Sequence, residues 1–198
     1  MTENIPNEVL EIILHQAVTM SAKTFESWST PAAFAGSTRS TVVNVLLVSR
    51  RWCDLAVPAL YEAAILRTKA QVQGLARSVH KTNERGIKRG AYLRRLRVEG
   101  GYNHHLHQIL GDSPGIVTLF LGFDISLDDT SARLKRALQR INPTRLFLQS
   151  TPGGHATQDN TQSLYAAVSG AIPNWTNLVS PLSTYSFGGA NEGEILLS

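Results

Sequence analysis

Three histidines stand close together at His104, His105 and His107, and their side chains are of a type that binds metal ions. A structural zinc site needs a second, separated pair of ligands, and the single cysteine, Cys53, lies far from the histidines in the sequence. We therefore interpret the histidine run as part of a surface helix. We expect no bound metal and no other cofactor.

The remaining polar residues form no catalytic pattern. Asp128 and Asp129 precede a predicted helix, where carboxylates favour the positive end of the helix dipole. The glycine pairs at 153–154 and 188–189 lack the lysine of a phosphate-binding loop and the spacing of a dinucleotide-binding turn. We interpret none of the serines as the nucleophile of a strand-to-helix elbow. The sequence thus predicts a protein that is not an enzyme and has no catalytic residues.

Composition limits the class of protein further. With 198 residues, 42% of them hydrophobic and 17% charged, the chain can form one ordinary domain, or a small domain and part of another. A lone cysteine excludes an intramolecular disulfide and suits a reducing compartment. The sequence has neither a basic start followed by an apolar run nor eighteen consecutive apolar residues, so we expect no secretory signal and no membrane partner. We expect an intracellular protein of the cytoplasm, the nucleus or both.

An apolar helical pattern at residues 42–57 organises the first part of the chain. Small or apolar residues recur there at three- and four-residue steps, namely Val42, Val45, Leu46, Ser49, Trp52 and Ala56. This spacing predicts one face of a helix. Pro58 is expected to stop or kink that helix, and residues 60–66 are expected to form a short strand.

A second helical pattern stands near the start of the chain, at Ile5-Pro6-Asn7-Glu8-Val9-Leu10-Glu11-Ile12-Ile13-Leu14. Proline suits a first helical turn, because its missing N–H has no partner there. Together with Leu46-Leu47-Val48-Ser49-Arg50-Arg51-Trp52, this start resembles the two ends of an F-box. The F-box is the helical module that docks onto a Skp-type adaptor in cullin-based ubiquitin ligases.

The resemblance covers about the first sixty residues and implies which of them contact the adaptor. Matched to the family's pattern, the partner-binding residues are Ile5, Pro6, Glu8, Leu10, Ile13, Leu46, Val48 and Trp52. The internal connection at about 15–41 is longer than in a compact F-box, and it is similar to that of fungal F-box-like sequences. We therefore expect an F-box-like helical module at residues 1–60 and a separate region at 61–198.

A loose repeat follows a predicted helix at 69–80 and a predicted loop at 81–90. Its strand-like runs are Leu93–Val98, Ile116–Leu121, Arg145–Leu148 and Trp175–Leu178, and helical patterns lie between them at 106–110, 134–141 and 164–172. Strands and helices in this order resemble an irregular leucine-rich repeat array, in which stacked units bury one another's apolar faces. The expected fold class is mixed α/β, with the helical module followed by a short solenoid that ends as a partial array.

Alternation along the predicted strands assigns their side chains to two faces. The core-facing residues are Leu96, Val98, Leu119, Leu121, Leu146 and Leu148. Their neighbours align in two rows on the opposite face, one with Arg95 and Arg145 and the next with Arg97, Phe120 and Phe147. Because interfaces favour arginine and aromatic side chains, we predict that these five bind a target. Burial of both phenylalanines under a loop is the open alternative.

The function that the resemblance implies is a substrate adaptor of a Skp/cullin/F-box ubiquitin ligase. The module would hold the Skp-type adaptor, and through it a cullin, while the repeat sheet would bind a target protein of unknown identity for ubiquitin-dependent degradation. One alternative is a leucine-rich-repeat scaffold without ligase attachment. The other is a nucleic-acid binder, because residues 67–145 carry fifteen Lys/Arg against six Asp/Glu and the stretch 81–97 is strongly basic. We expect no nucleic-acid partner, since aromatic residues for base stacking are sparse there.

Overall fold

The computed structural model describes residues 5–26, 42, 44–83, 86–99, 105–122, 131–150, 158–179 and 183–186. Residues 27–41, His104, Asp128, Asp129 and the two glycine pairs lie outside this part of the chain, so the expectations on them are not addressed. The chain divides into two compact units, Met1–Ala63 and Ala64–Ser198. The division falls at Ala63, whereas the sequence placed it at residue 60.

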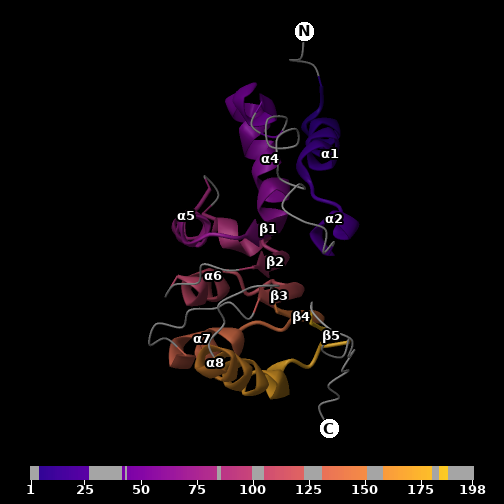
Figure 1. Cartoon of the computed structure of the whole chain (residues 1–198). Helices are drawn as coiled ribbons and strands as arrows, with labels where there is room; N and C mark the ends of the chain where they lie inside the picture. The colour runs from indigo at the N-terminus through magenta and orange to yellow at the C-terminus, as the bar shows by residue number, and fades with distance from the viewer. Residues whose placement is uncertain are drawn as a thin grey trace. The chain divides into compact units, whose positions relative to one another are not determined.

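The first unit is helical (Figure 1). Its helices are α1 (Asn7–Val18), α2 (Ala22–Glu26) and α4 (Arg50–Glu62). Helix α1 begins directly after Pro6, as the sequence predicts, and runs beyond residue 15, where a connection was expected. Leu10 and Leu14, one turn apart on α1, are buried together with Ala56 of α4. This small cluster is the core of the first unit.

The single helix expected at 42–57 is wrong. Residues 44–47 are helical, the backbone becomes extended at Ser49, and α4 starts at Arg50. The Ser49 side chain accepts a hydrogen bond from the Trp52 backbone N–H at 3.2 Å, an N-cap that stabilises a new helix start. The expected stop at Pro58 is also wrong, because α4 continues through it to Glu62. Proline removes the hydrogen bond to the Asp54 carbonyl, and Asp54 is exposed, where water can replace that bond.

The second unit is a five-stranded sheet with helices on one face (Figure 1). The strands are β1 (Ala63–Leu66), β2 (Arg95–Val98), β3 (Thr118–Gly122), β4 (Arg145–Ser150) and β5 (Ser183–Ser186). They lie in the order β1-β2-β3-β4-β5, so each strand neighbours the next one along the chain, and β2 to β5 are parallel. The mixed α/β class expected from the sequence is confirmed.

Helices α5 (Lys69–Val79), α6 (Leu106–Asp112), α7 (Ser131–Leu138) and α8 (Gln158–Ser169) connect these strands, with short 3-10 helices η2 (Arg89–Tyr92) and η3 (Ile172–Asn174). Each of the four helices contacts the next, α5 with α6, α6 with α7 and α7 with α8. A capping box at Thr68 and Gln71 starts α5, which confirms the helix expected at 69–80. None of the described helices is long and apolar enough to cross a membrane.

The core of the second unit lies between the helices and the sheet. All six leucines and valines predicted to face inward are buried in it, namely Leu96, Val98, Leu119, Leu121, Leu146 and Leu148. The strand pairing aligns Leu96 with Leu119 and Leu119 with Leu146. The register of the first three repeat units, and the side of the sheet that their leucines occupy, are therefore confirmed.

The fourth strand expected at 175–178 is wrong. Residues 175–178 follow η3 as a turn, and the strand that pairs with β4 lies further along, at Ser183–Ser186. Trp175 is buried instead, and its indole Nε1–H donates a hydrogen bond to the Leu138 carbonyl at 2.9 Å. The apolar spacing of 175–178 therefore reflects a turn that packs on the end of α7.

Candidate partner-binding surfaces

Helix α1 carries two apolar faces. Leu10 and Leu14 face the core of the first unit, whereas Val9, Ile12 and Ile13 remain 47–61% exposed. Residues three and four apart lie on the same side of a helix, so Val9, Ile12 and Ile13 form one outward strip. A helix that serves only its own core needs one apolar stripe, and α1 has a second one.

The segment just before α4 is also apolar and open to solvent. Leu47 is 76% and Val48 is 56% exposed. Both belong to the first unit, as does the α1 strip. We call the five residues Val9, Ile12, Ile13, Leu47 and Val48 the apolar docking set.

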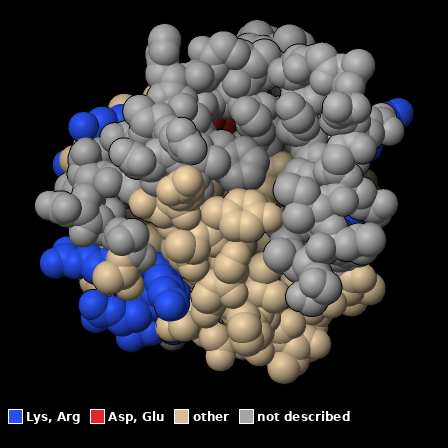
Figure 2. Space-filling view, turned by 60° about the horizontal axis from the view of Figure 1, so that its bottom comes forward, with Lys and Arg blue, Asp and Glu red and all other residues tan. Residues whose placement is uncertain are grey.

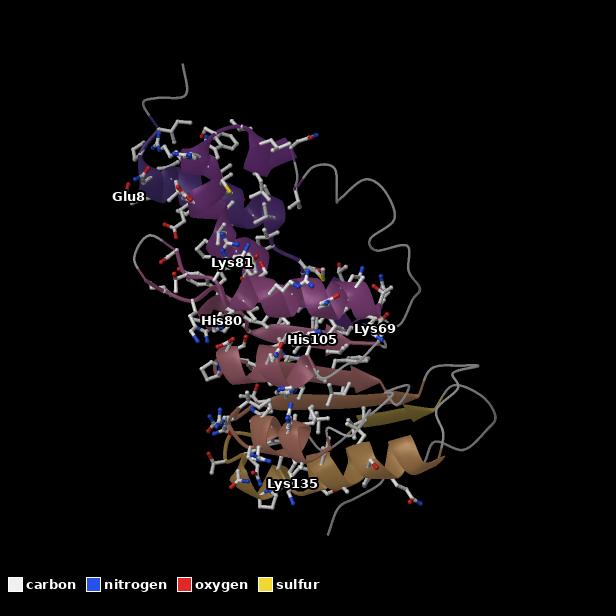
Figure 3. The ribbon with its side chains drawn as sticks, turned by 90° about the vertical axis from the view of Figure 1, so that its left-hand side faces the viewer. Glu8, Lys69, His80, Lys81, His105 and Lys135 are labelled. Atoms are coloured by element: carbon white, nitrogen blue, oxygen red, sulfur yellow. The ribbon has the colours of Figure 1, made fainter. Side chains whose placement is uncertain are left out.

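The eight residues predicted to contact an adaptor divide into two groups. Leu10 is buried, and Ile5, Leu46 and Trp52 are half-buried and pack against the Leu10–Leu14 cluster. The other four, Pro6, Glu8, Ile13 and Val48, are exposed, and Glu8 projects from the first turn of α1 (Figure 3). The expectation that Leu10 is available to a partner is corrected, since its side chain fills the unit's own core. Val9, Ile12 and Leu47 are exposed residues that sequence matching did not select.

Polar contacts hold the start of α1 against α4. The Arg51 Nε–H donates to Asn7 Oδ1 at 2.8 Å, and the same guanidinium donates to the Ile5 carbonyl. Near the other end of α1, His15 Nε2 lies 3.2 Å from Glu62 Oε2. Arg51 thereby fixes the residues around Pro6. The sequence could not reveal this contact, because a hydrogen bond across forty-four residues leaves no local pattern.

The strand pairing confirms the register of the two rows predicted for the target-binding face. Two of the side chains in these rows are nevertheless buried. Arg95, Thr118 and Arg145 are in register on adjacent strands, and so are Arg97, Phe120 and Phe147. Arg97 is only 4% and Phe120 only 1% exposed. The prediction that these two side chains form part of an open surface is therefore wrong, and for Phe120 the alternative of burial holds.

A chain of contacts explains why Arg97 tolerates burial. Its guanidinium lies 4.2 Å from the centroid of the Phe120 ring, and its Nε lies 2.6 Å from Glu99 Oε1. Glu99 also pairs with Arg67 Nε at 2.6 Å. Burial lowers the pKa of Arg97, while the charge of Glu99 and its hydrogen bond oppose that change. The carboxylate and the aromatic ring thus replace the water that the cation has lost.

The rest of the predicted target surface remains accessible. Arg145 is exposed, and Arg95 and Phe147 are half-buried. The Phe147 ring stacks on Phe120, with ring centroids 5.8 Å apart. Phe147 therefore stands at the boundary between the buried row and solvent, beside the exposed Arg145 on the same strand.

Three cations of the basic stretch 81–97 are held by contacts within the second unit or buried in it. Lys88 Nζ pairs with Asp112 Oδ1 at 2.7 Å, Arg94 donates to the Gly115 carbonyl at 3.1 Å, and Arg97 is buried. A nucleic-acid backbone is bound by cations that follow one groove or one face. Lys88, Arg94 and Arg97 instead lie at different places in the second unit.

One serine stands in a pattern that the sequence reasoning overlooked. Gly111-Asp112-Ser113-Pro114-Gly115 matches the letters Gly-x-Ser-x-Gly, and His80 Nδ1 lies 3.0 Å from Asp112 Oδ2. A nucleophile elbow connects a strand to a helix, whereas this segment leads from α6 into β3. The Ser113 hydroxyl is buried and forms no hydrogen bond with a described residue. The arrangement does not present an activated serine to a substrate.

The histidine run gives no metal site within the described part of the chain. His105 precedes α6, and its Nδ1 lies 3.0 Å from Gln108 Oε1 (Figure 3). Among the described residues, no group of three or more His, Cys, Asp or Glu side chains could hold a metal ion.

Comparison of the chain with protein-family models, with curated proteins and with solved structures found no match.

Proposed function

We propose that the chain is a substrate adaptor whose first unit docks onto a Skp-type protein of a cullin ubiquitin ligase. The observation that carries the proposal is the second apolar face of α1, with Val9, Ile12 and Ile13 exposed while Leu10 and Leu14 complete the unit's own core. Leu47 and Val48 are further exposed apolar residues of the same unit, just before α4. These residues coincide with the two segments that resemble the ends of an F-box.

The free energy gained by burying the apolar docking set is large enough to contribute to docking. Burying one valine, leucine or isoleucine side chain fully contributes about 1.5–3 kcal/mol. The docking set is already partly covered, so its five members contribute several kcal/mol on burial, on the order of the cost of association itself. Net affinity therefore needs polar contacts at the rim, for which Glu8 and Glu11 on α1 are exposed.

The second unit would present the target. Its strands follow one another across the sheet in chain order, and its helices contact one another in the same order. This order supports an irregular leucine-rich-repeat-like solenoid, in which each unit covers its neighbour. On the sheet, Arg145 and Phe147 combine an exposed guanidinium with a half-buried ring, and a target would contact this pair with Arg95 at its margin.

Co-expression of the full chain with a Skp-type adaptor tests this function. We expect the two proteins to elute together in size-exclusion chromatography and the melting temperature of the chain to rise as the concentration of free adaptor increases. Elution as two separate proteins, with no change in melting temperature, would favour a repeat scaffold without ligase attachment.

A further inference from the structure

Helix α7 and the turn after it carry a stripe of cations. Arg133, Arg136 and Arg140 are exposed, and Lys135 is exposed beside them. Arg133 and Arg136 are three residues apart and so lie about 4.5 Å apart along the helix axis, with Arg140 about one turn further. We call Arg133, Arg136 and Arg140 the arginine stripe.

The helix dipole does not account for the whole stripe. Cations are stabilising at a helix C-terminus, which suits Arg136 and Arg140. Arg133 lies in the first turn of α7, where a cation opposes the dipole. The stripe therefore places an arginine where it does not stabilise its own helix.

The charge of the stripe is not neutralised by the described part of the second unit. Glu99 and Asp112 are the acidic side chains described there, and both already pair with other cations, Glu99 with Arg67 and Arg97, and Asp112 with Lys88 and His80. None of the ion pairs among described residues involves the arginine stripe.

The helices on both sides of α7 add no cation to the stripe. Helices α6 and α8, which contact α7, contain no lysine or arginine. In Figure 2, lysine and arginine side chains gather at one edge of the described surface, beside a broad area without charged side chains. The cationic surface is therefore compact.

Lys135 has a different role from the arginines. A Cβ atom at Gly170 would lie 2.6 Å from Lys135 Cε, so the absence of a side chain at Gly170 lets the lysine stem lie against the end of α8. Gln139 Nε2 donates to the Gly170 carbonyl at 3.2 Å on the same side. Lys135, labelled in Figure 3, thus belongs to the contact between α7 and α8, and the stripe lies beside this contact.

We infer that the arginine stripe binds an acidic peptide segment of a partner protein. Guanidinium groups form bidentate, charge-assisted hydrogen bonds with carboxylates. In an extended peptide, every second side chain lies on the same side, about 6.6–6.8 Å apart. Carboxylates at alternate positions can therefore meet three arginines that follow one another along α7 and the turn after it. This inference goes beyond the proposed ligase function and does not depend on it.

The same observations favour a peptide over nucleic acid. A nucleic-acid site needs cations that continue along the phosphate backbone, and the helices on both sides of α7 provide none. Single-stranded binding also uses aromatic platforms, and α7 contains no aromatic residue. The stripe offers only three guanidinium groups, close together. This number suits the few carboxylates of a short acidic peptide segment.

The test is a titration of the full chain with a fluorescent ten-residue peptide that alternates glutamate and serine, followed by anisotropy. We expect binding that disappears when glutamine replaces each glutamate. The triple variant R133E/R136E/R140E should bind at least about tenfold more weakly, because three favourable charge pairs become repulsive. R133K/R136K/R140K keeps the charge but loses the bidentate geometry, so it should bind with intermediate affinity and unchanged melting temperature.

The matched control is K69E/R77E/K81E, which reverses three exposed cations on and just after α5 and gives the same net charge. Lys69 and Lys81 lie at opposite ends of α5 (Figure 3). We expect the control to change affinity less than about twofold at physiological salt, where charges beyond roughly 8 Å are screened. Equal weakening by both triple variants, or no binding of the peptide, would overturn the inference. So would tighter binding of a twelve-base-pair DNA duplex that is lost in R133E/R136E/R140E.

Discussion

The Arg97 guanidinium lies over the Phe120 ring, 4.2 Å from its centroid, and both side chains are buried. The pair lies on neighbouring strands, β2 and β3, at positions that face each other in the ladder. Phe147 on β4 continues the row by stacking on Phe120. Strand β3 is therefore buried on both of its faces, as is usual for parallel sheets.

Substitution of Phe120 tests this burial. We expect Phe120→Ala to lower the free energy of unfolding by about 3–5 kcal/mol, because it removes a buried ring and the partner of a buried cation. Phe147→Ala should cost less, since Phe147 is only half-buried. Urea unfolding followed by circular dichroism measures both. Leu121→Ala, on the opposite face, is the reference at about 2–5 kcal/mol. A harmless Phe120→Ala beside a destabilising Leu121→Ala would show that the Phe120 face is open.

The ion pairs of Asp112 predict a pH dependence. Burial alone would raise the pKa of Asp112, but hydrogen bonds from Lys88 and His80, together with their charges, lower it overall. A carboxyl with a lowered folded-state pKa stabilises the protein above its unfolded pKa of about 3.9 and loses that contribution as pH falls through the folded value. We expect Asp112→Asn to be less stable than the wild type at neutral pH and equally stable at the acid end.

The difference in stability between Asp112→Asn and the wild type should be small. His80 is largely exposed and Lys88 about half-exposed, so water screens both pairs and the difference should be about 1 kcal/mol or less. Melting temperatures of the two proteins from pH 7 down to pH 2.5 measure it. A difference that stays constant over this range would mean that Asp112 acts through packing near Gly90, whose backbone approaches the Asp112 carbonyl closely.

Substitution of Arg51 tests whether its hydrogen bonds to the residues on either side of Pro6 stabilise the first unit. Arg51→Met keeps most of the aliphatic stem but loses the hydrogen bonds to Asn7 and the Ile5 carbonyl. Hydrogen bonds from a charged group contribute about 1.5–3 kcal/mol each when shielded and less when exposed, so we expect a loss of about 1–2 kcal/mol. Arg50→Met is the matched control, since Arg50 is exposed and precedes Arg51 on α4. Equal unfolding midpoints for the two variants would contradict a fastening role for Arg51.

The repeat region could be predicted well from local patterns. Period-two leucines at Leu96, Leu119 and Leu146 gave both the register and the core side of three strands, because the side-chain period fixes the face. The prediction of a strand at 175–178 was wrong for a physical reason. Trp175 and Leu178 have the three-residue spacing with which the runs at Leu93 and Ile116 begin, but the indole is held by the Leu138 carbonyl, a contact between residues far apart in the sequence.

The candidate site was predicted less well than the fold. Alternation separates the two sides of a sheet, but it does not reveal whether the second side is covered, so Arg97 and Phe120 were expected in the open. On α1, Leu10 and Ile13 are three residues apart and both fit an apolar helical pattern, and only packing against Ala56 of α4 decides which of them is core. The interruption at Ser49 was also hidden, because its capping hydroxyl stands within a continuous apolar pattern.

Isothermal titration of the full chain with a purified Skp-type adaptor tests the central claim most directly. Ile12→Asp places a charge in the middle of the apolar docking set, at a side chain that is 61% exposed and so changes the fold little. Val179→Asp is the matched control, since Val179 is 82% exposed in the second unit. We expect the wild type and Val179→Asp to bind with dissociation constants within about twofold of each other, and Ile12→Asp to bind at least about tenfold more weakly at unchanged melting temperature. Equal affinities for Ile12→Asp and Val179→Asp, or no heat of binding for the wild type, would contradict adaptor docking through α1.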